Sequence, residues 1–292
     1  MLIDLHTHSN ASDGTDSPAE VVRLAKVQPR RLGVVALTDH DSTDGWAEAA
    51  VAADLHGITL VRGMEISTKH EGEGVHLLAY LPDPTYEPLM AELDRILEGR
   101  DGRLAGILER LQHVGVDLSE AEVRRQVGDA RAVGRPHIAA VMVAKGIVTT
   151  VDEAFARYLN QGRPGYVARY ATSTRTMIEL VTAAGGAAVI AHPWRRSRVV
   201  DGDVLQGFVE GGLAGIEVDH QNHDDEQRAE LRALARDLDL IATGSSDYHG
   251  ASKVNHALGC NTTSEAAYEQ LLDHAAANAR ASGRDVPAVV GR

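Results

Sequence analysis

The sequence predicts an α/β fold in which parallel strands alternate with helices and close into a barrel that a helical insertion interrupts. Short apolar runs alternate with helix-like patterns along most of the chain. Polar side chains of the kinds that bind metals stand where most of these runs end. Only helical periodicity is found in residues 95–168. The number of runs favours a closed barrel over a small open sheet.

The strands are predicted from seven apolar runs, at residues 2–5, 34–39, 58–67, 75–81, 187–193, 215–220 and 240–247. Ser17 and Glu20 form a capping-box pattern around Pro18, which predicts a helix start at that point. A second helix is expected over 46–55, stopped by Gly57, and a third from Ser173 to the glycines at 185–186. The repeating unit is therefore a strand followed by a helix.

The insertion is predicted to contain four helices, over residues 96–114, 119–127, 135–145 and 151–159, each ending near a glycine. Because the strand pattern resumes afterwards, the barrel is divided in sequence into residues 1–94 and 169–292. Residues 95–168 are expected to lie over one face of the barrel as a lid that takes part in substrate recognition.

Composition excludes several classes of protein. The chain has 292 residues and a formal net charge of -13, which disfavours stable binding of a long nucleic acid. Residues 95–175 are nevertheless net positive, with 13 Lys and Arg against 9 Asp and Glu. No apolar run is long enough to span a membrane, and the first ten residues do not resemble a signal peptide, so a cytoplasmic location is expected. The single cysteine, Cys260, cannot form an intrachain disulfide or a thiolate metal site alone.

The candidate metal ligands lie at the ends of predicted strands. His6 and His8 are two residues apart after an extended segment, so both imidazoles can reach one cation. The other candidates follow or open later strands: Asp13, His40, Glu65, His76, His192, Asp247 and His249. Any one of these could be a hydrogen-bonded core histidine or a helix-capping carboxylate. Their convergence on one barrel face indicates a metal-dependent active site.

The motifs DLHTHS, TDHD, GMEIS, GVHLLAY, AHP and SSDYHG, in this order, resemble those of the polymerase and histidinol phosphatase (PHP) family of metal-dependent phosphoesterases. The central RPHIA, AFARYL and GRPGYV resemble the insertion of the branch that includes 3',5'-nucleotide bisphosphate phosphatases and 5'-3' exoribonucleases. The resemblance implies a distorted (β/α)7 barrel holding three divalent ions. It implies that His6, His8, Glu65 and Asp247 hold one ion, that Glu65, His76 and His192 hold a second, and that Asp13, His40 and His249 hold a third.

Imidazole and carboxylate ligands without thiolate suit Mn, Fe or Zn, and Mn²⁺ is the expected metal. Hydrolysis by water activated in such a site needs no serine or cysteine nucleophile. Glu65, Asp247 and His249 are the expected catalytic residues, together with His223, which could contact phosphate, protonate the leaving oxygen, or only cap the next helix. Asp4, Asp39 and Asp41 are expected to orient histidines or cap turns.

Substrate contacts are expected from Arg135 and His137, at the start of a helix in the insertion, and from His223. The predicted reaction is hydrolysis of a nucleoside 3',5'-bisphosphate to a 5'-mononucleotide and phosphate. Trimming of short RNA in the 5'-to-3' direction and hydrolysis of histidinol phosphate are alternatives that use the same ligands, and amide hydrolysis by a related metal barrel is a further one. The alternative without catalysis is a metal-binding regulatory module. The oligomeric state is not predicted.

Overall fold

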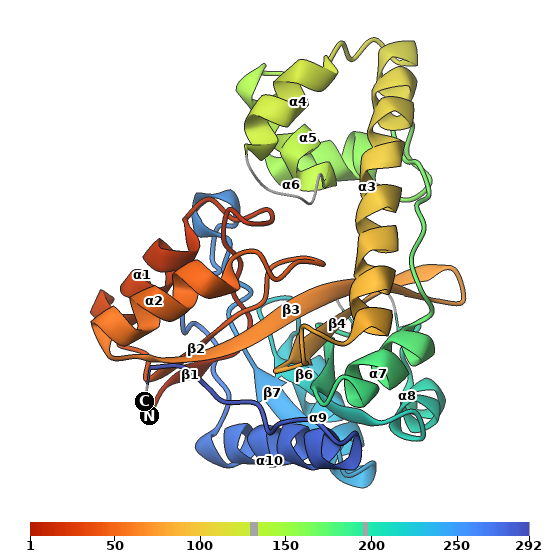
Figure 1. Ribbon diagram of the computed structural model, residues 1–292. Coiled ribbons are helices and arrows are strands. Elements are labelled where there is room, and N and C mark those ends of the chain that lie inside the picture. The colour runs from red at the N-terminus through yellow and green to blue at the C-terminus, as the bar shows by residue number, and fades with distance from the viewer. Residues whose placement is uncertain (129–133, 195–197, 292) are drawn as a thin grey trace.

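The fold is built on a seven-stranded sheet whose strands follow one another in space in chain order (Figure 1). The computed structural model describes residues 1–128, 134–194 and 198–291. The strands are β1 (Ile3–Asp4), β2 (Val34–Leu37), β3 (Thr59–His70), β4 (Glu73–Tyr80), β5 (Ala187–Ala191), β6 (Leu213–Asp219) and β7 (Ile241–Gly244). Each lies within or overlaps one of the predicted apolar runs, so the prediction of a mixed α/β fold is confirmed.

The prediction that all strands are parallel is wrong for β4. This strand runs antiparallel to both β3 and β5, whereas β1–β2–β3 and β5–β6–β7 are parallel. The reason is the short connection between β3 and β4, where His70 pairs with Glu73. Glu71 and Gly72 make this turn with φ values of 48° and 85°. A two-residue turn of this kind builds a hairpin and is too short for a crossover to a parallel strand.

The sheet is curled, and its two ends meet without a continuous ladder among the described residues. The contact between them is an isolated parallel bridge between Thr7 and Tyr248, where the His8 amide donates to the Tyr248 carbonyl at 2.8 Å. Both residues lie beyond the carboxyl ends of β1 and β7. The loops that carry the candidate site therefore lie side by side, although no ladder closes a full barrel.

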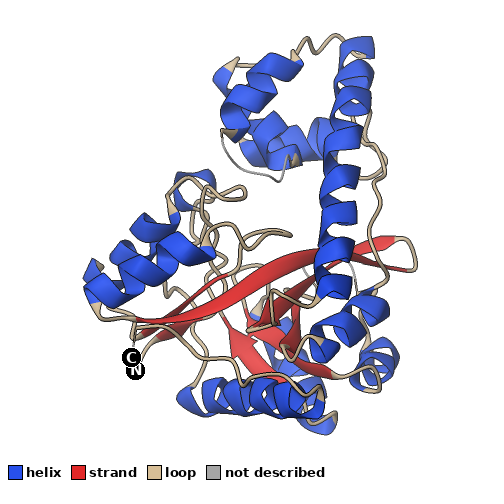
Figure 2. Cartoon of the chain, in the orientation of Figure 1, coloured by secondary structure: helices blue, strands red, loops and turns tan. Residues whose placement is uncertain are grey.

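Helices pack on the outside of the sheet (Figure 2). These are α1 (Pro18–Val27), α2 (Trp46–His56), α7 (Thr174–Ala183), α8 (Gly202–Val209), α9 (Asp225–Asp237) and α10 (Glu265–Ala281). The short 3₁₀ helix η2 (Gly250–Ser252) instead lies in the loop after β7, beside the cavity. Ser17 and Ser173 cap the first turns of α1 and α7 as predicted, and Gly57 ends α2 at φ 60°. The capping box at Ser17 is only half formed, because the Glu20 carboxylate pairs with Arg23.

The predicted helical insertion is present as α3 (Glu87–His113), α4 (Glu120–Val127), α5 (Arg135–Ala144), α6 (Val151–Ala154) and a π-helical turn η1 (Phe155–Leu159). These helices have a small core of their own, which includes Leu111, Val123 and Met142. Helix α3 begins nine residues before the predicted start at residue 96 and carries α4–α6 away from the sheet (Figure 1). The division at residues 94 and 168 stays a prediction. None of the helices within the described ranges has the length and apolarity needed to cross a membrane.

Candidate metal centre and its surroundings

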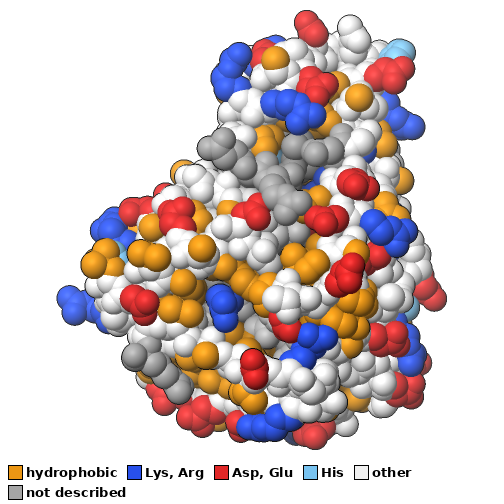
Figure 3. Space-filling model, in the orientation of Figure 1, with side chains coloured by type: hydrophobic (Ala, Val, Ile, Leu, Met, Phe, Trp, Pro, Cys, Tyr) orange, Lys and Arg blue, Asp and Glu red, His pale blue; other side chains and the backbone are white. Residues whose placement is uncertain are grey.

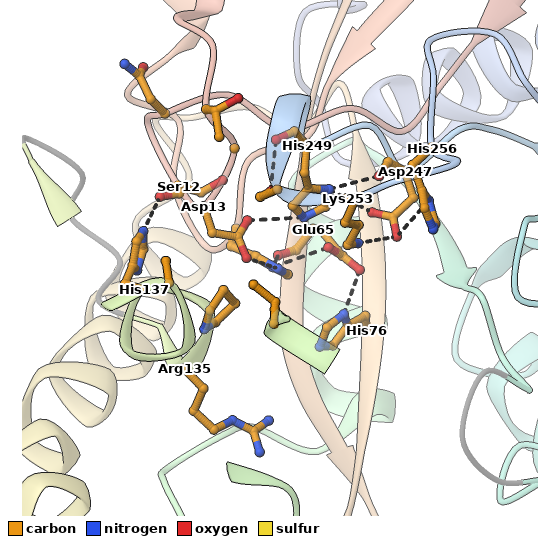
Figure 4. Close-up of a pocket in the computed structure, with 18 of the residues that line it drawn as sticks. Ser12, Asp13, Glu65, His76, Arg135, His137, Asp247, His249, Lys253 and His256 are labelled. Atoms are coloured by element: carbon orange, nitrogen blue, oxygen red, sulfur yellow. Dashed lines mark hydrogen bonds and ion pairs between the residues drawn. The ribbon is translucent and has the colours of Figure 1, made fainter. Parts of the chain in front are cut away.

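The nine predicted metal ligands come from strand ends along the whole sheet and meet in one region. His6 and His8 follow β1, His40 follows β2, His192 follows β5, and Asp247 and His249 follow β7. Glu65 and His76 lie within β3 and β4, and Asp13 lies in the loop after β1. Figure 4 shows several of these side chains pointing toward one another around Glu65. All of them except His6 and His8 border a cavity of about 1350 Å³.

The first group consists of four buried side chains whose ligand atoms lie within 4.8 Å of one another: His6, His8, Glu65 and Asp247. The Nε2 atoms of His6 and His8 are 3.0 Å apart. Glu65 Oε2 is 3.2 Å from His8 Nε2, and Asp247 Oδ1 is 3.5 Å from His6 Nε2. Two imidazole nitrogens and two carboxylate oxygens thus converge on one point, as the sequence predicts.

The second group uses the other oxygen of Glu65. Its Oε1 atom is 2.6 Å from His76 Nδ1 and 3.0 Å from His192 Nε2. The Oε2 atom faces the first group, so the two oxygens of one carboxylate face two sets of imidazoles. A carboxylate placed in this way can bridge two cations.

The third group consists of His8, Asp13, His40 and His249. Asp13 lies 3.2 Å from His249 Nε2 through Oδ1 and 3.7 Å from His40 Nε2 through Oδ2. The Oδ1 atom is buried and accepts no hydrogen bond from the described part of the chain. Because a buried carboxylate oxygen without a donor is costly, this oxygen fits a site that holds a cation.

The electrostatics of the three groups favour ionised carboxylates and a neutral His8. His6 differs, because burial opposes its protonation but Glu217 and Glu65 raise its pKa well above the usual value. Burial would raise the pKa of Glu65, but His76, His40 and His6 hold this pKa well below its usual value. Burial likewise opposes ionisation of Asp13, and His249 and His40 hold the Asp13 pKa well below its usual value. Burial, and the nearby His249, lower the pKa of His8 well below the usual value of 6.5. Ionised carboxylates and neutral imidazoles are the forms that bind metals.

Comparison with known proteins supports the prediction made from these motifs. Residues 4–91 match the PHP domain family. A 5'-3' exoribonuclease of Haemophilus influenzae is 36% identical over 84% of this chain and 89% of its own length. A 3',5'-nucleoside bisphosphate phosphatase of Chromobacterium violaceum is 34% identical over 88% of this chain and 90% of its own length. The chain belongs to the PHP family. It is a metal-dependent phosphoesterase, and the predicted resemblance is confirmed.

The PHP fold extends over nearly all of this chain. A crystal structure of a predicted metal-dependent phosphoesterase from Bifidobacterium adolescentis superposes with a TM-score of 0.88 at 35% identity. The match covers 93% of this chain and 96% of that chain. Both the sheet and the helical insertion are therefore shared with that protein.

Glu217 is a member of the PHP site that sequence analysis did not identify. Its Oε1 atom is 3.2 Å from His6 Nδ1, and its Oε2 atom accepts a hydrogen bond of 2.8 Å from the His192 backbone amide. Burial opposes ionisation, but His6 and His220 lower the pKa of Glu217 to about 2. The Glu217 carboxylate orients one residue from each of the first two groups. The sequence did carry one signal for this role of Glu217. It lies in the apolar run 215–220, and a carboxylate buried in a strand needs a partner.

Asp4, Asp39 and Asp41 hold the loops of the PHP site in place. Asp4 accepts hydrogen bonds from the Ser246 and Gly259 amides, at 3.0 and 2.8 Å. Asp39 accepts from the amide and hydroxyl of Ser9, at 2.8 and 2.6 Å, and Asp41 accepts from the Ser67 amide at 2.6 Å. Their predicted role in capping turns agrees with these contacts to backbone and hydroxyl groups, and Asp41 in addition pairs with Arg100.

His223 lies behind the site rather than on the cavity wall. Its Nδ1 atom donates to the Val218 carbonyl at 2.9 Å, and Nε2 is buried without a partner in the described ranges. His220, three residues earlier, is closer to the ligands, with Nε2 3.4 Å from Asp247 Oδ2. Lys253 reaches the same oxygen at 2.6 Å. His223 was the predicted residue. Neither His220 nor Lys253 was predicted, although His220 directly follows β6. The catalytic and substrate-binding roles of His223 stay predictions.

Arg135 and His137, the predicted substrate contacts, both border the cavity, but each makes contacts within the protein. The Arg135 Nη1 atom donates to the Leu159 carbonyl at 2.9 Å, and the guanidinium lies between the rings of Phe155 and Tyr166. Figure 4 shows it pointing away from Glu65. His137 Nδ1 accepts from the Gly134 amide at 3.0 Å, so Nε2 carries the proton and donates to the Ser12 carbonyl at 3.1 Å. His137 thus joins α5 to the loop that carries Asp13.

Proposed function

We propose that this PHP-family enzyme hydrolyses a phosphate monoester of a small nucleotide, releasing phosphate from a nucleoside 3',5'-bisphosphate to leave the 5'-mononucleotide. The observation that carries the proposal is the carboxylate of Glu65, whose two oxygens face two separate sets of imidazoles. The similarity to a bacterial 3',5'-nucleoside bisphosphate phosphatase supports this choice of substrate.

The residues present fit three divalent cations, with Mn²⁺ as the expected metal and Fe or Zn as alternatives. We assign His6, His8, Glu65 and Asp247 to the first ion, Glu65, His76 and His192 to the second, and Asp13, His40 and His249 to the third. Divalent cations in such a site lower the pKa of water and offset the charge of a phosphoryl group. Glu65 and Asp13 also need cations for a second reason, because the groups around these carboxylates are imidazoles rather than lysine or arginine side chains.

The protein groups around the ligands hold the reaction centre in a fixed geometry. Glu217 orients His6 and His192, and His220 and Lys253 contact Asp247. The insertion completes the cavity through α5 and η1, which supply Arg135, His137 and Phe155 to its wall. We propose that these helices act as a lid that recognises the nucleotide within a distorted (β/α)7 barrel.

The distribution of charged side chains on the surface suits a small substrate better than a long nucleic acid. Figure 3 shows acidic and basic side chains interspersed over the visible face, without a continuous basic stripe. With a net charge of -13, this surface is poorly suited to a long polyanion. A nucleotide or a short oligonucleotide can still reach the cavity, where arginines and, when bound, divalent cations offset its charge. The cytoplasmic location stays a prediction.

Trimming of short RNA is the second candidate function, because a relative of similar identity is named a 5'-3' exoribonuclease. Phosphate and nucleotide release should be measured with Mn²⁺ on four substrates: a nucleoside 3',5'-bisphosphate, a 5'-mononucleotide, a short 5'-phosphorylated RNA and histidinol phosphate. We expect the highest kcat/KM for the bisphosphate, with phosphate and 5'-mononucleotide as the products. A preference for histidinol phosphate, or no turnover of any nucleotide, would overturn the proposal.

A further inference from the structure

Three arginines border the cavity on the side of α3, next to the metal ligands. Arg100 and Arg103 lie three residues apart on α3 and therefore share one face of the helix. Arg169 lies on the segment that leads from the insertion back to α7. The exposed fractions of Arg100 and Arg103 are only 6% and 8%, which is unusual for arginine. These three residues are called the arginine cluster below.

One carboxylate, that of Asp41, faces two members of the arginine cluster, Arg100 and Arg169. Arg100 contacts Asp41 Oδ2 through Nε at 2.7 Å and Nη2 at 2.6 Å, and it also donates to the Ser67 hydroxyl. Arg169 Nη1 is 3.9 Å from the same Asp41 oxygen and has no hydrogen-bond partner within the described ranges. Asp41 Oδ1 is taken by the Ser67 amide. The charge of Asp41 is therefore largely committed to Arg100.

Arg103 lacks a counterion within the described ranges of the chain. Its guanidinium forms no hydrogen bond or ion pair with the residues that the structure describes. Its strongest charged neighbours are the three cations Arg169, Arg135 and Arg100. Burial, with these neighbours, lowers the pKa of Arg103 to about 8, and burial beside Arg100 lowers the pKa of Arg169 to about 9. A buried guanidinium is costly unless it is paired, so the described lining on this side of the cavity leaves positive charge that an anion can neutralise.

The arginine cluster is connected to the third group of metal ligands through Asp41. Asp41 follows His40, a ligand of the third group, and Arg100 acts on the electrostatics of His40. Arg135, whose predicted contact with phosphate stays a prediction, donates to the Leu159 carbonyl and lies near the rings of Phe155 and Tyr166. Arg103 and Arg169 thus present guanidinium groups to the cavity close to the metal ligands.

We propose that Arg103 and Arg169 form an anion subsite that holds the phosphate that is not cleaved, while Arg100 and Asp41 position it. The proposal rests on the proposed function, because it assigns the second phosphate of a nucleoside 3',5'-bisphosphate. Forked guanidinium groups match phosphate oxygens and supply the charge that Asp41 does not neutralise. The reacting phosphate lies at the metal ligands, and the second lies against α3.

The kinetic test compares two substrates that differ only in the 5'-phosphate: adenosine 3',5'-bisphosphate and adenosine 3'-monophosphate. Arg103→Gln and Arg169→Gln should lower kcat/KM for the bisphosphate ~10- to 100-fold and change kcat/KM for the monophosphate by less than ~3-fold. Arg103→Lys should recover part of the loss, because an ammonium keeps the charge but not the fork. Arg110→Gln, an exposed change on the same helix, is the matched control and should change neither value.

The binding test needs no turnover. Adenosine 5'-monophosphate should bind to the chelator-treated protein in a calorimetric titration. Its affinity should be at least ~10-fold weaker in Arg103→Gln and unchanged in Arg110→Gln. Thermal unfolding checks the fold of Arg103→Gln, whose Tm should not fall, because the change removes a buried cation without a counterion.

The two tests separate the subsite from the proposed function. Equal losses of kcat/KM on both substrates, or equal binding of adenosine 5'-monophosphate to Arg103→Gln and wild type, would overturn the subsite and leave the phosphatase standing. Absence of bisphosphate hydrolysis by the wild type, with binding still dependent on Arg103, would overturn the proposed function and leave the subsite standing.

Discussion

At the scale of single residues, Glu65 connects the first two metal groups because each of its oxygens faces different imidazoles. Replacing it with an isosteric amide keeps the shape and removes the charge. Glu65→Gln should lose at least one equivalent of metal and lower kcat more than ~100-fold, since metal ligands matter more than the groups that orient them. Metal analysis and steady-state kinetics on the same preparation measure both effects.

Glu73→Gln is the control for this change, because Glu73 is exposed in the hairpin between β3 and β4 and lies outside the three groups. It should retain metal and activity. Full metal content in Glu65→Gln would show that Glu65 does not hold the ions.

Residue patterns alone indicated much of the site. His6 and His8 could be recognised because their spacing places both rings on one side of an extended chain, and His249 because it follows an apolar run. Glu217, His220 and Lys253 were missed because their roles depend on which loops lie side by side. Arg103 was not singled out, because its sequence position on a charged helix does not reveal that the fold buries it without a counterion among the described residues.

At the scale of secondary-structure elements, His137 joins α5 of the insertion to the Ser12 loop beside Asp13. His137→Ala removes the donor to the Ser12 carbonyl and the acceptor for the Gly134 amide. The loss of these buried hydrogen bonds should cost about 1–3 kcal/mol of local stability. Hydrogen exchange should therefore quicken in α5 and in the Ser12 loop, with β5–β7 unchanged. Unchanged protection of α5 would show that the insertion is held by other contacts.

Helix α10 carries His274, a histidine whose protonation should affect the stability of the fold. Burial lowers the pKa of His274 from its usual value of 6.5, and Nε2 has no partner among the described residues. The unfolded chain therefore binds more protons than the folded chain as pH falls through 6.5, and stability falls with it. His274→Gln should reduce the loss of Tm between about pH 7.5 and about pH 5.5, whereas His113→Gln, an exposed change, should not. The same pH dependence in all three proteins would contradict this assignment.

Most helices were predictable because their signals are local: Ser119 begins α4, and Gly57 ends α2. The direction of β4 was not predicted, since the apolar run 75–81 is equally compatible with a parallel strand. Its direction depends on the turn at Glu71 and Gly72, which the strand periodicity does not reveal. The early start of α3 was also missed, because residues 87–95 follow a strand closely and were assigned to the connection.

At the scale of the whole molecule, the curled sheet brings the nine expected metal ligands together, and the helical insertion lies beside them. The strand order explains why ligands as distant in sequence as His6 and His249 meet, since the loops after β1 and β7 touch at Thr7 and Tyr248.

Bound ions should also stabilise the fold, because ligand binding to the folded state alone raises its stability. Removal of metal should therefore lower Tm, and Mn²⁺ should restore it in a calorimetric scan. An unchanged Tm after proven metal loss would argue against a built site.

The central claim is that phosphate release depends on metal held by these residues. The most direct test is phosphate release from a nucleoside 3',5'-bisphosphate by one preparation of the enzyme, measured with its metal, after chelation, and after Mn²⁺ is returned. The account predicts release of phosphate and the 5'-mononucleotide in the first state, none in the second, and recovery in the third. Undiminished release by protein that metal analysis shows to be empty would contradict it.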